Sequence, residues 1–436
     1  MKANSFGKYF GIATFGESHG KAIGVLLQDV LPGIKFPYEE IKIAFSRRKT
    51  SSNPYSSQRK EADNFEVLSG VLNGVTTGMP ICIIIYNKDH NSNDYENVKN
   101  IFRPSHADFS YYKKFKIYDY RGGGRASGRE TIARVVAGEL VDKLLEDIKI
   151  YAYPIKIGEI EAKEINLDFK NELNWYDKKT YPTLIKYLDN IKGEKDSVGG
   201  IVEVVIKNIP AGLGDPVFEK LDANLAKAVL SIGAIKGIEF GKGFELANMQ
   251  GSGANDQINN SGFLSNNAGG IVGGISTGQD IVLRFVIKPT SSIGKQQKTV
   301  DIQNNEKVIK IKGRHDICIV PRILQVAVSM IKLTLADAIS YQKLLSSQER
   351  KLNDYREAFD KIDEDILIAI GRRNLLARDI GLLKKRENLE IFDIKREEKV
   401  IVELVEKGKE WGLKAETIMR VWKTLLNESK DIQKKC

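Results

Sequence analysis

Short apolar runs alternate irregularly with helical stretches over the first two-thirds of the chain. The runs GVLLQDV, MPICIIIYN, GGIVEVVIKNIP and QDIVLRFVIKP are rich in Val and Ile and are bounded by turn residues, as strands are. Apolar residues three and four positions apart predict helices over 129–145 and 217–230. Because strands and helices follow no regular βαβ order, the pattern predicts an α+β fold rather than a doubly wound parallel sheet.

Two segments of this region are mainly polar. Residues 164–195 are rich in Lys, Asp, Asn and Tyr, and we expect them to form a peripheral helical insertion. Residues 248–267 are rich in Gly, Asn and Ser, which predicts a long loop with a functional or mobile role.

The pattern changes near Ser340, where glycine becomes rare and a helical period begins. We therefore predict two domains, residues 1–345 and an all-α domain of residues 346–436. Within the second, apolar residues repeat in steps of three and four from Glu349 to Arg386 and form a seam of Leu352, Tyr355, Phe359, Ile362, Ile366, Ala369, Leu376, Ile380 and Leu383.

Arg373 occupies the one place in this seam where an apolar residue is missing. A charge that faces a core is costly unless it is paired, so we expect an anionic ligand inside the helix bundle. Lys384 lies about three turns further on nearly the same face. The last helix has a similar seam, in which Ser429 takes a polar place and Gln433 follows one turn later.

The alternative is a coiled-coil oligomerisation tail whose polar residues set the register. Either way, a helix of about 38 residues is too long for so small a domain to cover alone. We therefore expect it to pair with a second chain.

Composition and charge indicate which classes of ligand this chain is expected to bind. Net charge is +10, with 42% apolar and 28% charged residues, which is ordinary for a soluble protein. Aromatic residues do not interleave with the basic ones as stacking platforms would, which favours polyanionic small molecules over nucleic acid. The N-terminus lacks the apolar core of a signal peptide, and no apolar run approaches the length of a membrane span.

The three cysteines are far apart, at Cys82, Cys318 and Cys436. They suggest neither a disulfide framework nor a metal cluster, and we expect a reducing, cytoplasmic location. No HExxH or CxxC spacing indicates a metal site.

The densest group of candidate functional residues is Arg121–Arg134, RGGGRASGRETIAR. Three consecutive glycines leave the backbone bare, and a helical period follows at once. A glycine-rich loop directly before a helix N-terminus is suited to anions, and arginines add planar charged forks. The alternative is a solvated basic turn. The clustering with Ser127 and Thr131 favours an anion site.

Gly16–Gly20, GESHG, formally matches the G-x-S-x-G elbow of hydrolases. That elbow requires a strand, a turn and a helix, whereas the following AIGVLLQDVLPG predicts a strand. The histidines are more informative. Among four in the chain, His19, His106 and His315 lie in the polar contexts ESHG, RPSHAD and GRHD. We expect them to transfer protons or contact phosphate.

Nine motifs in order resemble those of chorismate synthase, over residues 5–338: GESHG, RRKTSSNPYSSQRKEAD, SGVLNGVTTGMPI, RPSHAD, RGGGRASGRETIARVVAG, SIGAIKGIEFG, NNAGGIVGGISTGQ, KPTSSI and GRHD. The resemblance implies a β-α-β sandwich, a homotetramer and a reduced flavin mononucleotide (FMN) cofactor, with NADPH as a candidate external reductant. The implied reaction is the 1,4-elimination of phosphate from 5-enolpyruvylshikimate 3-phosphate, which gives chorismate without net redox change.

The resemblance also implies roles for individual residues. Substrate is expected on Arg48, Arg103, Arg129 and Arg134. His19 is expected beside the departing phosphate, His106 beside the flavin, and Asp316 with Ser18 near the flavin N5. Expected flavin contacts are Arg125, Ala126, Ser127, Gly233, Ala234, Gly273, Lys288, Pro289, Thr290, Ser291, Ser292 and Arg314. Ile317, Val328 and the loop 49–58 depart from the usual family pattern.

The helical region resembles the all-helical chorismate mutase, through YREAFDKIDEDILIAIGRRNLLARDIGLLKKRENLEIFDIKREE and SKDIQ. That family rearranges chorismate to prephenate without a cofactor, and its first active-site arginine reaches into the partner's site of an intertwined dimer. The corresponding residues are Arg356, Arg373, Lys384, Glu397 and Gln433 in catalysis, and Asp393, Arg396 and Ser429 in substrate binding. Together the two resemblances imply a bifunctional enzyme. The alternative is a synthase with a catalytically inert helical oligomerisation module.

Overall fold

The computed structural model describes residues 2–49, 53–56, 63–87, 99–145, 147–311, 316–345, 352–390, 392–410 and 412–435. The chain divides into two compact units, Met1–Lys343 and Leu344–Cys436. We describe each unit by itself.

The first sheet of the larger unit has five antiparallel strands, in the order β1-β2-β3-β7-β4. Residues of one face alternate with those of the other, so that Ile81, Ile83 and Ile85 are fully buried while Tyr86 is exposed. The strands are β1 (Ser5–Phe6), β2 (Ile12–Gly16), β3 (Ala22–Leu27), β4 (Phe65–Val67) and β7 (Ile81–Tyr86).

The second sheet also has five antiparallel strands, in the order β11-β16-β10-β8-β9. Val202, Val204 and Ile206 of its central strand face the core and are fully buried. The strands are β8 (Lys149–Ile157), β9 (Ile160–Glu161), β10 (Gly200–Lys207), β11 (Ile235–Phe240) and β16 (Ile281–Ile287).

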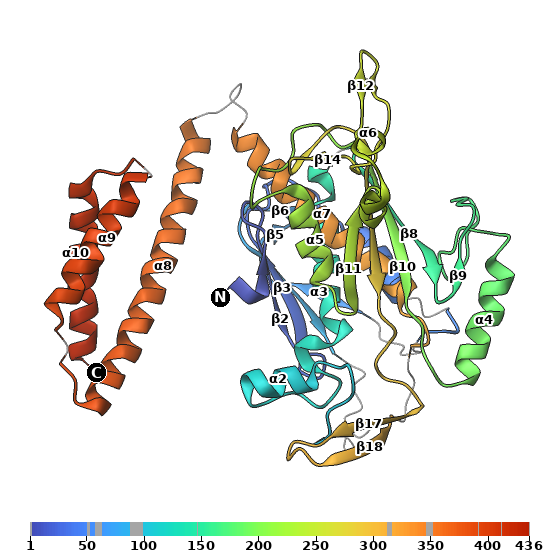
Figure 1. Cartoon of the computed structure of the whole chain (residues 1–436), viewed down its shortest axis with the longest axis horizontal. Coiled ribbons are helices and arrows are strands. Elements are labelled where there is room, and N and C mark those ends of the chain that lie inside the picture. The colour runs from blue at the N-terminus through green and yellow to red at the C-terminus, as the bar shows by residue number, and fades with distance from the viewer. Residues whose placement is uncertain are drawn as a thin grey trace. The chain divides into compact units, whose positions relative to one another are not determined.

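Helices fill the space between the two sheets. Figure 1 shows α3 (Thr131–Leu140), α5 (Leu221–Leu230) and α7 (Val320–Leu345) in this layer, and α1 (Tyr38–Lys49) packs against α3. A Cβ on Gly138 of α3 would lie 2.6 Å from the Cβ of Ser329 on α7, so the two helices cross closely where glycine leaves room. The predicted α+β sandwich is confirmed.

Helix α7 is long and apolar enough, by length and composition alone, to cross a membrane. The expectation that no apolar run reaches this length is therefore wrong. In the described structure 67% of its apolar window is buried within the chain, since the helix lies between two apolar sheet faces. Its hydrophobicity is that of a core helix.

The two sheets are built in the same way. The order β2-β3-β7-β4 of the first matches β8-β10-β16-β11 of the second. Each half continues from its second strand through a turn, a helix, a strand and a short hairpin. The hairpins are β5 (Val71–Leu72) with β6 (Val75–Thr76), and β14 (Ile271–Val272) with β15 (Ile275–Ser276).

The hydrogen bonds of the two hairpins repeat as well. The Thr76 hydroxyl donates to the carbonyl of Leu31 and accepts from the N–H of Ile34. The Ser276 hydroxyl donates to Pro210 and accepts from Leu213 in the same way. The larger unit therefore contains two copies of one structural motif.

Peripheral elements partly differ from the sequence predictions. The predicted helix 217–230 begins only at Leu221, because Val217 adopts a left-handed φ of 66°. Residues 164–195 contain one helix, α4 (Tyr181–Gly193), after a loop organised by the buried Asp177. Residues 248–267 are not a simple loop, since they contain α6 (Gly251–Ala254) and a hairpin of β12 (Ile258–Asn259) and β13 (Gly262–Phe263). The remaining elements are α2 (Asp108–Phe115), β17 (Gln296–Val300), β18 (Glu306–Lys310) and short 3₁₀ turns.

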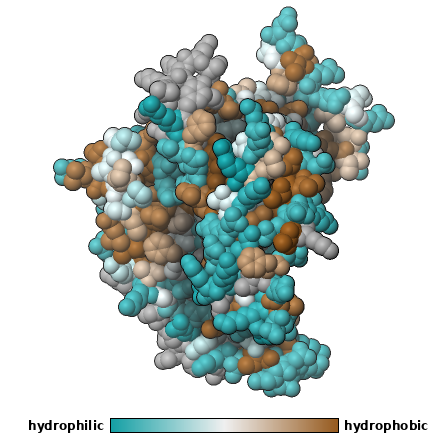
Figure 2. Space-filling view, turned by 90° about the vertical axis from the view of Figure 1, so that its left-hand side faces the viewer, coloured by the Kyte–Doolittle hydropathy of each residue, from teal (hydrophilic) through white to brown (hydrophobic). Residues whose placement is uncertain are grey.

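The smaller unit consists of α8 (Leu352–Glu387), α9 (Ile394–Glu410) and α10 (Ala415–Lys434), with α10 packed against both others. Among the described side chains of α8, Ala377 in the C-terminal half is buried. The described residues of the predicted seam are mostly uncovered within the helical unit, and Phe359, Ile366 and Leu376 are 66%, 51% and 62% exposed. Hydrophobic residues reach the molecular surface among polar ones, as Figure 2 shows for one face.

Candidate active sites

The glycine triplet lies against the two histidines that sequence motifs singled out. Gly122 and Gly123 have left-handed φ values of 79° and 92°. A Cβ on Gly122 would lie 2.5 Å from Cε1 of His19, and one on Gly123 would lie 2.7 Å from Cε1 of His106. Consecutive glycines thus make room for two imidazoles that are far apart in sequence.

The triplet does not lead straight into a helix, as the sequence suggested. Two 3₁₀ turns, Gly124–Ala126 and Gly128–Glu130, intervene before α3 begins at Thr131. The helix N-terminus is therefore not the direct continuation of the glycine loop. Gly122 and Gly123 of the triplet instead pack directly against the rings of His19 and His106.

His19 and Ser18 occupy the turn between β2 and β3, and both are buried. The Ser18 hydroxyl lies 3.0 Å from Nδ1 of His19. This turn joins two strands rather than a strand and a helix, so the geometry of a hydrolase nucleophile elbow is absent, as predicted.

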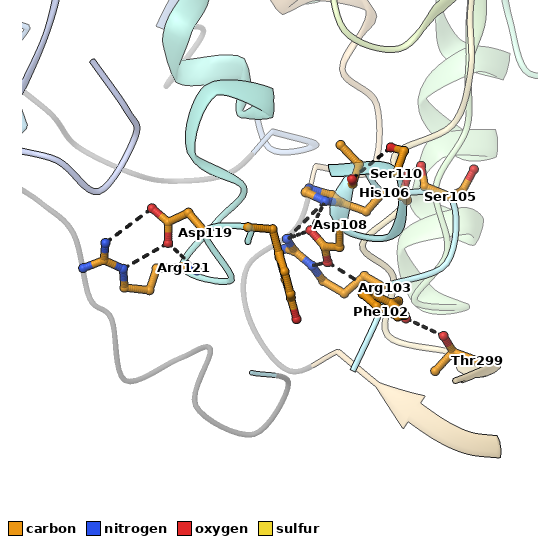
Figure 3. A network of polar contacts seen from close by, with 12 residues as sticks. Phe102, Arg103, Ser105, His106, Asp108, Ser110, Asp119, Arg121 and Thr299 are labelled. Atoms are coloured by element: carbon orange, nitrogen blue, oxygen red, sulfur yellow. Dashed lines mark hydrogen bonds and ion pairs between the residues drawn. The ribbon is translucent and has the colours of Figure 1, made fainter. Parts of the chain in front are cut away.

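His106 belongs to a compact cluster with Arg103 and Asp108 at the start of α2 (Figure 3). Arg103 donates from Nε to Oδ2 of Asp108 at 2.7 Å and from Nη2 to Oδ1 at 2.8 Å. Nδ1 of His106 lies 2.7 Å from the same Oδ1. Burial alone raises the pKa of Asp108, but hydrogen bonds from Arg103 and His106 hold this pKa well below its usual range.

Arg129 and Arg134 are likewise held by buried carboxylates. Arg129 donates from Nη1 to Asp63, whose side chain is 1% exposed and also pairs with Lys49 at 3.2 Å. Arg134 donates from Nε to Glu130 at 2.9 Å, and Glu130 accepts from Thr14 at 2.8 Å.

The remaining contacts of these arginines lead into neighbouring elements. Arg134 also reaches Ser231, at the end of α5, with 2.7 Å between Nη1 and the hydroxyl. Arg48 is buried beside Thr131, at 3.4 Å from Nε to the hydroxyl.

Sequence reasoning missed all three carboxylates. Asp108 and Glu130 lie within five residues of their arginines and inside the quoted motifs, so local spacing could have shown them. Asp63 could not be found in this way, because folding alone brings it to Arg129.

The predicted flavin contacts fall into separate groups. Arg125 donates to the Thr14 hydroxyl at 2.7 Å and to the Gly16 carbonyl at 3.2 Å, and Ala126 and Ser127 follow it in the 3₁₀ turns. Lys288 donates to the Ser105 carbonyl at 2.7 Å and to the Ser291 hydroxyl at 2.8 Å.

Lys288 thereby joins the predicted flavin segment to the residue that precedes His106. Burial lowers the pKa of Lys288, and the nearby charge of Lys236 lowers it further. The backbone N–H of Lys288 donates to the carbonyl of Ala234 at 2.9 Å, which brings in Gly233 and Ala234. The same segment continues through Pro289, Thr290 and Ser292.

Three predicted residues are not drawn into this cluster by the described contacts. Gly273 lies in the turn between β14 and β15, at the opposite end of the unit from α2 and the β17–β18 hairpin in Figure 1. Asp316 forms an ion pair with Arg322 of α7 at 2.8 Å, and its closeness to Ser18 stays a prediction. Arg314 and the histidine after it lie outside the described residues.

A cavity of about 400 Å³ adjoins the His106 cluster. Its lining combines the aromatic rings of Phe102 and Phe109 with the polar groups of Arg103, Ser105 and His106. A larger cavity of about 740 Å³ lies elsewhere, between Arg47, Tyr153 and Lys332, and includes none of the predicted residues. Of these two cavities, the smaller is the one lined by predicted site residues, Arg103 and His106.

In the helical unit, the structure brings Arg373 and Ser429 together across α8 and α10. Arg373 donates from Nη1 to the Leu425 carbonyl at 2.5 Å and to the Ser429 hydroxyl. No carboxylate within the described part of the chain forms an ion pair with Arg373. Burial lowers the pKa of Arg373, which the charge of Glu428 partly opposes. The prediction of an inward-facing cation is confirmed.

The other predicted mutase residues surround the same helices. Glu397 of α9 pairs with Lys430 of α10 at 3.1 Å. The Asp393 side chain accepts from the backbone N–H of Arg396 at 2.9 Å and thus caps α9, a structural role that sequence reasoning did not assign. Oε1 of Gln433 is buried and lacks a hydrogen-bond partner among the described residues. Lys384 is half-buried on α8, and Arg356 is exposed on its N-terminal half.

Comparisons with known proteins place both units in known enzyme families. Residues 10–340 match the family model "Chorismate synthase", and residues 355–434 match "Chorismate mutase type II". A chorismate synthase of Desulfatibacillum aliphaticivorans is 45% identical over 353 residues, which cover 80% of this chain and 99% of that protein. One of Archaeoglobus fulgidus is 46% identical over 355 residues, which cover 78% and 98%.

A solved structure supports the same conclusion. A crystal structure of a chorismate synthase aligns with a TM-score of 0.61 and 30% identity, covering 82% of this chain and 98% of that one. The chain therefore belongs to the chorismate synthase family and carries a chorismate mutase type II domain, so that lyase and isomerase domains share one polypeptide.

Proposed function

We propose that this chain catalyses two consecutive steps of aromatic amino acid biosynthesis. The first is 1,4-elimination of phosphate from 5-enolpyruvylshikimate 3-phosphate, and the second is rearrangement of the resulting chorismate to prephenate. The observation that carries the first step is the pair His19 and His106, seated on consecutive glycines among carboxylate-held arginines. For the second step it is the inward Arg373, whose hydrogen-bond acceptors among the described residues are neutral.

The arginines suit a substrate with one phosphate and two carboxylates. Arg103, Arg129 and Arg134 are each oriented by a buried carboxylate, so their forks are fixed before a ligand arrives. Arg48 adds a fourth buried cation. His19 is placed to protonate the departing phosphate, because its ring lies in the same glycine-lined wall.

The residues around the smaller cavity fit reduced FMN. The rings of Phe102 and Phe109 offer an apolar wall for a flavin ring, and Lys288, Ser105 and Ser291 offer polar contacts beside it. Bound reduced flavin supplies electron density that eases loss of the phosphate. His106 holds or moves a proton at this wall, and Arg125 supports the Gly16 turn that carries His19. NADPH is a candidate for external reduction of the flavin.

In the mutase domain, cations hold the substrate in a folded conformer. Arg373 binds a carboxylate, while Lys384 donates to the ether oxygen that gains negative charge in the transition state. Glu397 and Gln433 complete the polar lining, with Ser429 orienting Arg373. No covalent group is needed for this rearrangement.

A homo-oligomer fits the surface of the helical unit. The described residues of the α8 seam are mostly uncovered within the helical unit, which supports pairing with α8 of a second copy. Arg356, exposed on the uncovered half, then serves the partner's site. We infer a tetramer in which mutase domains pair as dimers, working in the cytoplasm on small molecules.

Anaerobic turnover tests both steps together. The full chain is supplied with 5-enolpyruvylshikimate 3-phosphate and reduced FMN, and chorismate, prephenate and phosphate are measured over time. We expect chorismate to appear first and prephenate to follow. Phosphate release without prephenate contradicts the second step, and no phosphate release contradicts the first.

The uncovered α8 seam also supports the alternative of an inert helical module, because a dimerising coil exposes the same stripe. R373L decides between the two. An inert module predicts unchanged products, whereas a mutase predicts that chorismate accumulates.

A further inference from the structure

His106 is joined to a buried carboxylate, Asp108, that has no role in the function described above. We propose that Asp108 is a positioning residue. It holds His106 in the tautomer with a hydrogen on Nδ1, so that Nε2 is the atom that accepts and returns a proton in the synthase reaction. The inference deepens the proposed function and rests on the role given there to His106.

The distance between the two groups locates the proton. Nδ1 of His106 and Oδ1 of Asp108 are 2.7 Å apart, which is a hydrogen-bond distance and requires a proton between them. Hydrogen bonds from Arg103 and His106 hold the pKa of Asp108 well below its usual range, so the carboxylate is ionised at neutral pH. The proton therefore resides on Nδ1.

Arg103 is consistent with this assignment. Its Nη2 is 3.1 Å from Nδ1 of His106 but only 2.8 Å from Oδ1 of Asp108. One of the two hydrogens on Nη2 points to the carboxylate at the shorter distance, and with Nδ1 protonated the 3.1 Å approach is a contact between two donors that share one acceptor. Asp108 is 3% exposed and is thus a fixed acceptor shared by two donors.

The rest of the site leaves Nε2 as the working atom. A Cβ on Gly123 would lie 3.3 Å from Nε2, so the glycine keeps this edge of the ring unobstructed. The preceding residue, Ser105, is anchored by Lys288 at 2.7 Å, which fixes the backbone next to the ring. With Nδ1 engaged by Asp108, a neutral His106 presents a lone pair at Nε2, where it can accept a proton and later return it.

Nitrogen-15 NMR of the imidazoles tests the tautomer directly. The chain has four histidines, and H106A identifies the His106 signals. We expect neutral His106 in the wild type to show the Nδ1–H pattern. In D108N the amide offers one acceptor where the carboxylate offers two, and its NH₂ can donate to Nδ1. We expect the Nε2–H tautomer to become substantially populated, and kcat of phosphate release to fall about 10²- to 10⁴-fold.

Two further variants separate positioning from folding. D108E keeps an ionised acceptor and should retain the Nδ1–H pattern with part of the activity. D119N is the matched control, since Asp119 pairs with Arg121 at 3.0 Å in the same region and forms no hydrogen bond or ion pair with a described histidine (Figure 3). It should leave the His106 signals unchanged.

The outcomes are distinct. An Nε2–H pattern in the wild type overturns the inference even if D108N fails to fold. It is also overturned if D108N keeps the wild-type pattern, whether or not activity falls. A tautomer change in D108N without any phosphate release by the wild type would leave the positioning role standing and instead reject the proposed elimination.

Discussion

The two catalytic units hold their arginines in opposite ways. In the synthase unit, Arg103, Arg129 and Arg134 each meet a carboxylate whose side chain is at most 7% exposed. In the helical unit, the hydrogen bonds of Arg373 within the described part of the chain go to the Leu425 carbonyl and the Ser429 hydroxyl. Both arrangements fix the orientation of a planar guanidinium, but only the carboxylates of the synthase unit neutralise its charge.

The difference follows from what surrounds each arginine. The synthase arginines lie within a thick α+β unit, where an unpaired charge would be costly. Arg373 lies between helices of a thin bundle and is half-buried, so neutral acceptors suffice. The charge of Arg373 is therefore not neutralised by an ion pair among the described residues, whereas each of the three synthase arginines is paired with a carboxylate.

The largest expected effect is the loss of mutase activity when Arg373 is replaced by Leu. Mutase activity should fall on the order of 10³-fold or more, since carboxylate binding and transition-state stabilisation are both lost. The unit should be as stable as before or more so, because a desolvated cation is removed and the apolar repeat restored. Prephenate formation and thermal unfolding are measured on the same variant.

The exposed neighbour Arg372 provides the matched control, and R372L should leave mutase turnover nearly unchanged. Synthase turnover should be unchanged in both variants. A destabilised R373L with intact mutase activity would show that Arg373 is structural.

Replacing Asp63 by Asn tests the carboxylate-held arrangement through stability. The variant leaves Arg129 and Lys49 with a neutral partner in a buried place. The free energy of unfolding should fall by about 3 kcal/mol, the scale of a broken buried pair. Urea unfolding of the full chain measures it. D119N, in a half-exposed pair, should cost less than about 1 kcal/mol. Equal losses in both variants would contradict the comparison.

Replacing His19 or His106 by Ala removes one of the two imidazoles that lie against Gly122 and Gly123. Turnover of the elimination should fall by roughly 10²-fold or more in either variant, the scale of lost acid–base help. Flavin should still bind to H19A, as flavin fluorescence can show. Full activity in both variants would reject proton transfer by these residues.

The smallest expected effect is a different response of the two units to acid, measured as the loss of amide-exchange protection. Asp108 has a pKa below its usual value in the folded state, so its contribution is complete above the unfolded pKa of about 3.9 and is lost as pH falls below it. The contacts of Arg373 with other described residues involve no carboxylate. Amide exchange at pH 5 and pH 3, corrected for intrinsic rates, should show protection of α2 falling by up to about tenfold. Protection near Arg373 should change less, and equal changes would contradict the assignment.

Two segments that are distant in sequence meet beside His106. Lys288-Pro289-Thr290-Ser291 directly follows β16, whereas Arg103-Pro104-Ser105-His106 precedes α2. The two segments are joined by the bonds from Lys288 and Ser291 to Ser105.

The sequence by itself determined those features that depend on residues close together along the chain. Short Val- and Ile-rich runs predicted several of the main strands, and the three-four repeat predicted α8 and the inward Arg373, because side-chain direction follows directly from helix periodicity. The motifs also identified His19 and His106 as candidates for chemistry. The Arg103, His106 and Asp108 cluster is local enough to have been read in full.

Only the tertiary structure decided which distant residues meet. It seats His19 and His106 on consecutive glycines, gives Arg129 its partner Asp63, and joins Lys288 to Ser105. It also leaves Gly273 apart from the histidines and makes Asp393 a helix cap. Contacts of this kind depend on how sheets and helices pack, and local periodicity contains no information about that packing.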